Sequence, residues 1–214
     1  MTDPVAIANK ALTKLGAERI LLLEDDVKAA RVMKALFADV RDAELAAYHW
    51  KFAIRRAQLP ALVDAPAFGY EFTYLLPRDY LALVQLNDLL VLARRHGKPW
   101  WSIEGDRLLS DWAPPLRIRY VARVEDYRLF SPLFVEVLSC KLALEACESL
   151  TQSNTKKQNL WQEYEQALRR AIRQDAVETA PDVAAQGNWL AARESGGMTG
   201  SEAADSARSG GFYG

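Results

Sequence analysis

A stretch of alternating apolar residues in the middle of the chain constrains the fold more than any other feature. Tyr70, Phe72, Tyr74 and Leu76 recur at every second position, so an extended strand would place all four side chains on one face. Pro77 follows directly and would end this strand, because proline has no backbone donor. Segments with helical spacing lie on both sides. The sequence therefore predicts an α+β protein, mainly α, with a small antiparallel β region inserted between N- and C-terminal helices.

Four segments have the periodicity and end signals of helices. Asp3 is a suitable N-cap, Pro4 suits a first helical position, and Gly16 suits a left-handed exit, so the first helix is bounded on both sides. Ser131 followed by Pro132 gives the same start signal later in the chain. The predicted helices cover residues 4–15, 27–48, 132–150 and 155–178.

The second helix is preceded by the acidic run Glu24, Asp25 and Asp26. We expect these carboxylates to cap the helix and to complement its dipole. An acidic metal site is the alternative, but the chain has no second cluster of ligands spaced to join it. The residues expected on the inner side of this helix are Ala30, Met33, Leu36, Phe37, Val40 and Ala47.

The third helix carries a wide apolar surface, which predicts burial on more than one side. It contains both cysteines, Cys140 and Cys147. Seven helical residues separate them by about 10 Å, too far for a disulfide, so buried thiols in a reducing compartment are expected. The fourth helix should pack against the third, with Leu160, Trp161, Tyr164, Leu168 and Ala171 recurring at helical spacing.

The β region is expected over residues 68–124. Residues 80–86 form a second candidate strand, and residues 101–111 read as a hairpin with a turn at Gly105 and Asp106. A last strand over residues 116–124 should divide its side chains between two faces. Leu116, Ile118, Tyr120 and Ala122 fall on the face expected to be buried, and Arg117, Arg119 and Arg123 on a solvated or partner-facing side.

Composition limits the classes of protein to which this chain can belong. Its 214 residues are half apolar and about one quarter charged, enough for one good core or a core with a small satellite domain. A net charge of −1 and a sequence pI near 6.2 argue against a protein whose main affinity comes from neutralising phosphates, so any contact with nucleic acid would be local. With no signal-like N-terminus and no long apolar run, we expect a soluble protein that remains in the cytoplasm, without a membrane partner.

The sequence contains no recognisable catalytic motif. Nucleophilic hydrolysis needs a base close to a nucleophile, and neither of the two histidines, His49 and His96, has a partner motif. We therefore expect no enzyme, no cofactor and no metal. A pair of carboxylates that cleaves a glycan needs no short motif, so this chemistry stays open.

Cations and aromatic side chains mix at one site, which contains Arg94, Arg95, Lys98 and Trp100. Glycine and proline place the basic part on a loop. It can be a solvated hairpin tip followed by a core tryptophan, or a contact site, since such mixtures also bind single-stranded nucleic acid. The overall charge favours a protein partner over DNA.

The composition of the chain changes at its C-terminal end. Residues 1–178 are expected to form one domain, and residues 179–214, rich in Gly, Ser and Ala, an extended arm that orders on binding. The large apolar side chains of this arm are the candidate partner contacts, namely Trp189, Leu190, Phe212 and Tyr213.

Seven short motifs, taken in order, resemble those of the head-to-tail adaptor family of tailed phages, called tail tubular protein A in short-tailed phages. The resemblance spans roughly residues 4–178. The motifs are Ala11-Leu12-x-x-Leu15-Gly16, Asp39-Val40-Arg41-Asp42 with Glu44-Leu45, His49-Trp50-Lys51-Phe52-Ala53, Phe68-Gly69-Tyr70 through Leu76-Pro77-Arg78-Asp79, Glu104-Gly105-Asp106-Arg107-Leu108-Leu109, Tyr120-Val121-Ala122-Arg123-Val124, and Phe130-Ser131-Pro132-Leu133-Phe134.

The resemblance implies a structural protein of the virion, at the junction of head and tail, that is assembled in the host cytoplasm. Proteins of this family form a homo-oligomeric ring, usually of about twelve copies, under the portal protein. They join it to a tail or nozzle protein, while genomic DNA passes through the ring without sequence-specific binding. By analogy of position, the C-terminal arm would reach the portal. A cell-wall hydrolase and a nucleic-acid-binding accessory protein of a phage particle are the alternatives.

Overall fold

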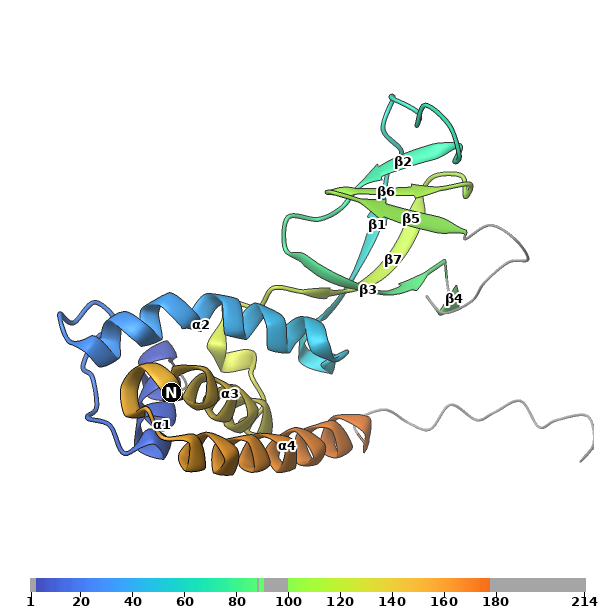
Figure 1. The fold of residues 1–214 in the computed structure, drawn as a ribbon. Coiled ribbons are helices and arrows are strands. Elements are labelled where there is room, and N and C mark those ends of the chain that lie inside the picture. Colours follow the sequence, from blue (N-terminus) through green and yellow to red (C-terminus); the bar gives the residue numbers. More distant parts are fainter. Residues whose placement is uncertain (1–2, 88, 91–99, 178–214) are drawn as a thin grey trace, which may run out of the picture. The chain divides into compact units, whose positions relative to one another are not determined.

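The computed structural model describes residues 3–87, 89–90 and 100–177 (Figure 1). These residues form four helices and two small antiparallel sheets, which makes the protein mixed α+β and mainly α. The helices are α1 (Pro4–Leu15), α2 (Lys28–Ala47), α3 (Pro132–Thr151) and α4 (Asn154–Val177), with the short 3-10 helices η1 (Lys51–Ala53) and η2 (Tyr127–Leu129). The expected insertion of a β region between helices is confirmed.

The ends of α1 and α3 follow the capping signals in the sequence. Asp3 Oδ1 accepts a hydrogen bond of 2.6 Å from the Ala6 N–H, and Gly16 leaves α1 in the left-handed region with φ 68°. At the start of α3, the Ser131 hydroxyl accepts from the Phe134 N–H at 3.2 Å. Each cap satisfies backbone groups that the first or last helical turn cannot pair.

The expected acidic cap of α2 is wrong. The N-cap is Val27, which makes no side-chain hydrogen bond. Asp25 instead closes the preceding turn, where its Oδ2 accepts from the N–H groups of Leu21 at 2.8 Å and Leu22 at 3.0 Å. Glu24 and Asp26 form exposed ion pairs with side chains of α2.

One residue expected on the inner side of α2, Ala47, is exposed. The inner positions of the last turn are occupied by Glu44 and Leu45, both buried, so the final residue of the helix faces solvent. Arg41 is also buried. This face of α2 is therefore more polar than its sequence pattern predicts.

Within the β region, the described residues form seven strands in two sheets. The first has the order β1-β7-β3-β4, and the second has the order β2-β6-β5. The strands are β1 (Ile54–Leu59), β2 (Phe72–Leu75), β3 (Tyr80–Leu86), β4 (Leu89–Leu90), β5 (Trp101–Glu104), β6 (Arg107–Ser110) and β7 (Leu116–Ala122). The strand predicted at 80–86 and the hairpin with its turn at Gly105, which has φ 63°, are confirmed.

Strand β1 lies outside the predicted β region, which began at residue 68. It pairs with β7 over its whole length, from Ile54 opposite Val121 to Leu59 opposite Leu116. The adjacent Arg55 and Arg56 interrupt the apolar alternation that marks a strand. The pairing with β7, remote in sequence, therefore determines this strand.

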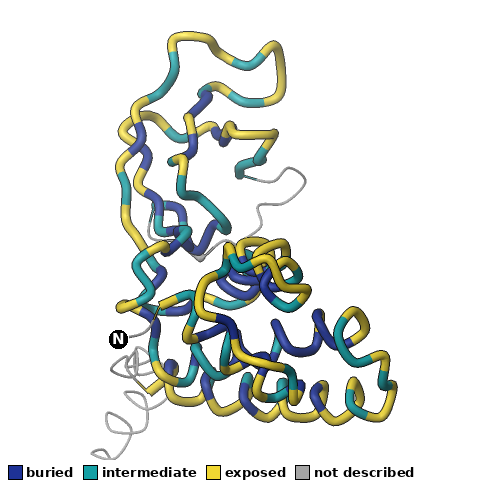
Figure 2. Tube along the Cα trace, turned by 90° about the vertical axis from the view of Figure 1, so that its left-hand side faces the viewer, coloured by how far each residue is buried: buried dark blue, intermediate teal, exposed yellow. Residues whose placement is uncertain are grey.

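Two cores meet at β7. Buried residues gather both among the helices and in the β region (Figure 2). One side of the strand contributes Val121 to a large core among the helices. The other side contributes residues to a smaller core between the sheets. As predicted for that side, Leu116, Ile118, Tyr120 and Ala122 are buried. The other alternating set, in β2 and the residues beside it, is only partly confirmed, since Tyr74 and Leu76 are buried whereas Tyr70 and Phe72 are half-buried.

Helix α3 packs against α1 and α2 and is buried on several sides, as predicted. Both cysteines are free and buried within it. Helix α4 differs from expectation at Trp161, which is 48% exposed. The buried stripe of α4 passes through Leu160, Ala167 and Ala171, and Trp161 is turned by about 100° from Leu160.

The predicted arm over residues 179–214 lies outside the described residues, together with Trp189, Leu190, Phe212 and Tyr213. The same holds for Arg94, Arg95 and Lys98 of the basic loop. Among the described residues, no helix is long and apolar enough to cross a lipid bilayer.

Trp50 joins the segment after α2 to the helical core. The side chain is 1% exposed, its indole N–H donates to the Glu44 carbonyl at 2.8 Å, and its ring meets that of Phe134 edge-on at 5.0 Å. It therefore combines apolar burial with a satisfied donor.

We expect Trp50→Phe to lower the free energy of unfolding by about 2 kcal/mol, because it removes a buried hydrogen bond and part of a packed ring. Urea denaturation measures this change. The matched control, Trp161→Phe, alters an exposed ring and should shift stability by less than about 0.5 kcal/mol. Equal effects of the two substitutions would contradict the assignment of Trp50 to the core.

Candidate interaction surfaces

The face of the first sheet that points away from the β core changes from apolar to basic along its length. Near the helices this face carries Ile54 and Val121, and α2 contacts β3 and β7 there. Farther along, the same face carries Arg56, Arg119 and Gln85, because strand residues of equal parity share a face. Gln58 and Arg117 are also on this part, opposite each other across β1 and β7. We call these five residues the basic face.

The basic face surrounds a hollow of about 460 Å³. Arg56 and Arg119 are direct cross-strand partners, and like charges in such positions repel. Arg119 Nη1 donates to Gln85 Oε1 at 2.8 Å, while its Nε is buried without a hydrogen-bond partner. The sequences of β1, β3 and β7 contain no acidic residue. The basic face therefore favours an anionic group from outside these strands.

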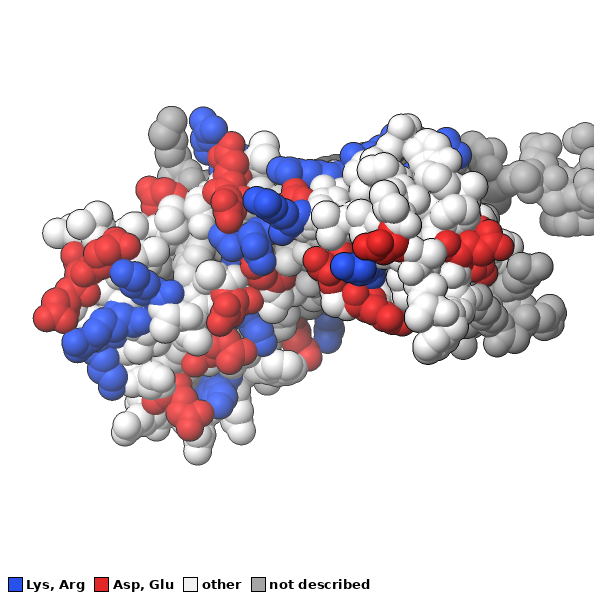
Figure 3. All heavy atoms as spheres, turned by 90° about the horizontal axis from the view of Figure 1, so that it is seen from above, with Lys and Arg blue, Asp and Glu red and all other residues white. Residues whose placement is uncertain are grey.

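Acidic residues lie at both ends of the outward side of the second sheet, whose middle is buried, and Arg107 lies on the same side. Glu71 and Asp111 lie side by side at one end, where the Glu71 N–H donates to Asp111 Oδ1 at 3.2 Å. Glu104 lies at the other end, paired across the hairpin with Arg107, and Asp106 is in the adjacent turn. We call Glu71, Glu104, Asp106 and Asp111 the acidic face. In the view from above, basic and acidic side chains gather along different margins of the β region (Figure 3).

A third surface lies between α3 and α4. Leu144 and Trp161 form the apolar part of a groove of about 510 Å³, flanked by Lys141 and Lys157. Exposed tryptophan is characteristic of protein contacts. The sequence pattern did not predict this surface, because Trp161 was expected in the core.

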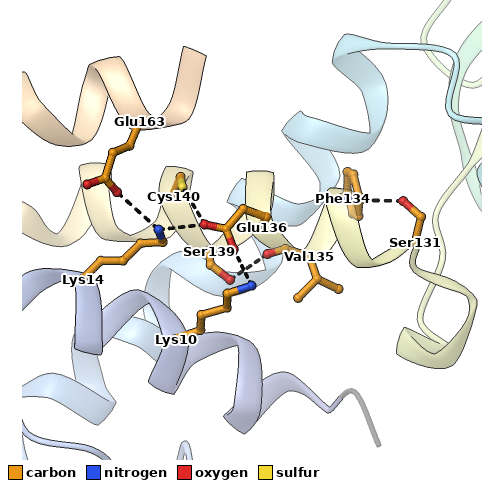
Figure 4. A network of polar contacts seen from close by, with 9 residues as sticks. All are labelled: Lys10, Lys14, Ser131, Phe134, Val135, Glu136, Ser139, Cys140 and Glu163. Atoms are coloured by element: carbon orange, nitrogen blue, oxygen red, sulfur yellow. Dashed lines mark hydrogen bonds and ion pairs between the residues drawn. The ribbon is translucent and has the colours of Figure 1, made fainter. Parts of the chain in front are cut away.

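A cluster of titratable side chains joins α1, α3 and α4 (Figure 4). Glu136 accepts from Lys10 and, at 2.7 Å, from Lys14, and Lys14 also contacts Glu163 at 3.2 Å. The Cys140 thiol is 3.7 Å from the Glu136 carboxylate. Lysines, carboxylates and a thiol so close together are the kinds of group that catalytic sites use, so their protonation must be considered.

Protonation in this cluster favours a structural role. Burial acts to raise the pKa of Glu136, but hydrogen bonds from Lys10 and Lys14 outweigh it and lower the pKa to about 2. The carboxylate is thus a weak base. Burial raises the pKa of Cys140 to about 11, which keeps its thiol protonated and unreactive. The cluster fastens three helices together.

A second polar cluster lies between α2, α3 and α4. The Tyr164 hydroxyl contacts both carboxylate oxygens of Glu44 at 3.0 Å, and Lys141 lies over the Tyr164 ring at 5.4 Å from its centroid. Burial raises the pKa of Glu44, and burial together with the Glu44 charge raises that of Tyr164. Among the described residues, no group of acidic, His or Cys side chains is arranged to hold a metal ion.

Two of the residues expected at interaction sites have other surroundings. Trp100 is half-buried and packs on Trp112 with ring centroids 5.3 Å apart. Arg123, expected on a solvated or partner-facing side, donates to Asp42 of α2 at 2.7 Å. Arg117 and Arg119 do belong to the basic face, whereas Arg56 was missed together with β1.

No protein-family model matches the sequence, and no curated protein matches it significantly.

Glu136→Gln should make the protein about 1 kcal/mol less stable near neutral pH, because both lysines lose a charged partner. The pKa of about 2 in the folded protein lies below the usual value for an unfolded chain, so the unfolded state binds the proton first as the pH falls. The advantage of Glu136 is therefore full above about pH 5 and is lost as the pH falls towards about 2.

Urea denaturation of both proteins over this pH range tests the expectation. Glu148→Gln, which removes an exposed carboxylate paired with Lys157, serves as the control and should show a smaller difference. A difference between wild type and Glu136→Gln that does not change with pH would contradict the lowered pKa.

Proposed function

We propose that the protein is a head-to-tail adaptor of a tailed phage, which forms a ring under the portal and joins it to the tail. Its C-terminal arm, residues 179–214, would dock on the portal. The proposal rests on the family resemblance of the sequence, and one structural observation supports it most. The separate motifs that carry the resemblance contribute to shared cores rather than lying scattered on the surface.

Five of the seven motifs meet in the core among the helices. Their buried members are Ala11, Leu12 and Leu15; Val40 and Leu45; Trp50 and Ala53; Val121 and Val124; Phe130 and Phe134. The other two motifs supply Tyr74, Leu76 and Leu108 to the core between the sheets. The apolar residues of these motifs, although distant in sequence, therefore pack together, as expected of motifs that specify one fold.

The charged residues of these motifs also form contacts between segments. Asp42 of α2 accepts from the Arg41 side chain at 2.8 Å and from Arg123 at 2.7 Å. Asp79, which follows the strand motif, binds Arg55 at 2.6 Å and accepts from the Tyr120 hydroxyl at 3.1 Å. Asp42 thus links α2 to the residue that follows β7, and Asp79 links β1 to β7.

The loop between β1 and β2 supports a role in contacting other proteins. Phe68, part of the fourth motif, is 88% exposed, and Val63 on the same loop is fully exposed. Two large apolar side chains on one exposed loop suit a contact with a tail or nozzle protein, although single exposed apolar residues are common.

The mass of the complex with purified portal rings tests this function. At micromolar concentration we expect the protein alone to be monomeric or weakly associated, and portal rings to take up about a dozen copies, as a closed ring requires. Native mass spectrometry or light scattering measures the uptake. A chain lacking residues 179–214 should not be taken up if the arm docks on the portal.

The matched control replaces residues 179–214 with a Gly-Ser sequence of equal length, which separates loss of specific contacts from loss of chain length. This control should behave like the deletion. Absence of uptake by the full-length chain would refute the adaptor function, whereas a stable ring without the portal would refute only the need for a template.

A further inference from the structure

The outward side of the first sheet is basic, whereas that of the second is mostly acidic, with Arg107 opposite Glu104. The basic face includes Arg56 and Arg119 on the first sheet, and the acidic face includes Glu71 and Glu104 on the second. The inward sides of both sheets supply the β core, so the two faces are separated by that core. A single copy therefore cannot bring its own two faces together.

Charge decides how two copies can pair through these faces. Basic against basic and acidic against acidic repel, so a symmetric contact that uses one face twice is disfavoured. Basic against acidic attracts and uses different surfaces of the two copies. Such a contact leaves one free face at each end, so further copies add in the same direction until a ring closes.

The groups on the two faces also match chemically. Arg56 and Glu104 are exposed, and Arg119 is half-buried at the hollow. A planar guanidinium binds a carboxylate with two parallel hydrogen bonds, a geometry that lysine does not offer. A carboxylate between Arg56 and Arg119 would relieve the repulsion between these cross-strand partners.

We propose that copies of this chain associate head to tail, with the acidic face of one copy docked on the basic face of the next. That this contact occurs within a ring depends on the adaptor function proposed above. The pairing of the two faces itself rests on their charges. The occupant of the hollow is a carboxylate of a second copy.

Self-association of four full-length proteins tests the pairing by sedimentation equilibrium. The proteins are wild type, Arg56→Gln with Arg119→Gln, Glu71→Gln with Glu104→Gln, and a control with Arg31→Gln and Arg169→Gln. The control removes two exposed charges on helices, so its net charge equals that of the first variant. Measurements reach several hundred micromolar protein at about 20 mM salt, where surface charges are least screened.

Wild type and the control should associate equally, and more weakly as salt rises. Each face variant should associate at least tenfold more weakly. An equimolar mixture of the two face variants should give mainly dimers, because the acidic face is intact in one variant and the basic face in the other, while the opposite face of each is weakened. Arg56→Glu, at an exposed position, repeats the test if Arg119→Gln alters the far-UV circular dichroism.

A wild type that stays monomeric under these conditions would overturn the proposal, and so would a basic-face variant that associates like wild type. If that variant associates normally but loses a portal or tail partner, the basic face binds a different acidic protein and the contact between copies is wrong. Head-to-tail association without portal uptake would instead refute the adaptor function and leave this contact standing.

Discussion

Strand β7 is the element on which both cores depend. Its residues of one parity enter the core between the sheets, and Val121, of the other parity, enters the core among the helices. A slip of one residue in its pairing with β1 would exchange the two sets. Arg119 would then point into the β core, and Val121 would leave the helical core. The register of one strand therefore fixes both the packing of the helices and the position of the basic face.

A network of charged residues also links α2 to the segment that follows β7. Asp42 on α2 binds both Arg41 and Arg123, and Arg41 Nη1 contacts the Tyr127 hydroxyl at 3.3 Å. A buried or half-buried charge without a partner lowers the stability of the folded protein, and removing one partner leaves the other charges unpaired. Such a network tolerates few alternative arrangements of α2 against β7. It gives the junction specificity, whereas the apolar contacts supply most of its stability.

Local sequence patterns predicted those helices and strands whose position is determined by their own residues. The first helix has its cap, its stripe and its Gly16, and β3 has a continuous apolar run, so both agree with the sequence. Strand β1 and the inward placement of Arg41 and Glu44 depend on partners far along the chain, which periodicity does not report. The candidate site divides in the same way. Arg117 and Arg119 were visible as alternating residues, but the position of Arg56 opposite Arg119 follows only from the pairing of β1 with β7.

The attachment of α4 has a mechanical consequence. Few large apolar side chains of this helix are buried, and polar contacts secure both of its ends. Near its start, Lys156 Nζ donates to the Leu15 carbonyl. In its last turn, Asp175 Oδ1 accepts from the Lys51 N–H at 3.1 Å, one residue from Trp50. Tension applied to the chain beyond residue 177 would therefore act first on the Asp175 contact. The segment between α2 and β1, which contains Lys51, would be pulled before the rest of the helical bundle.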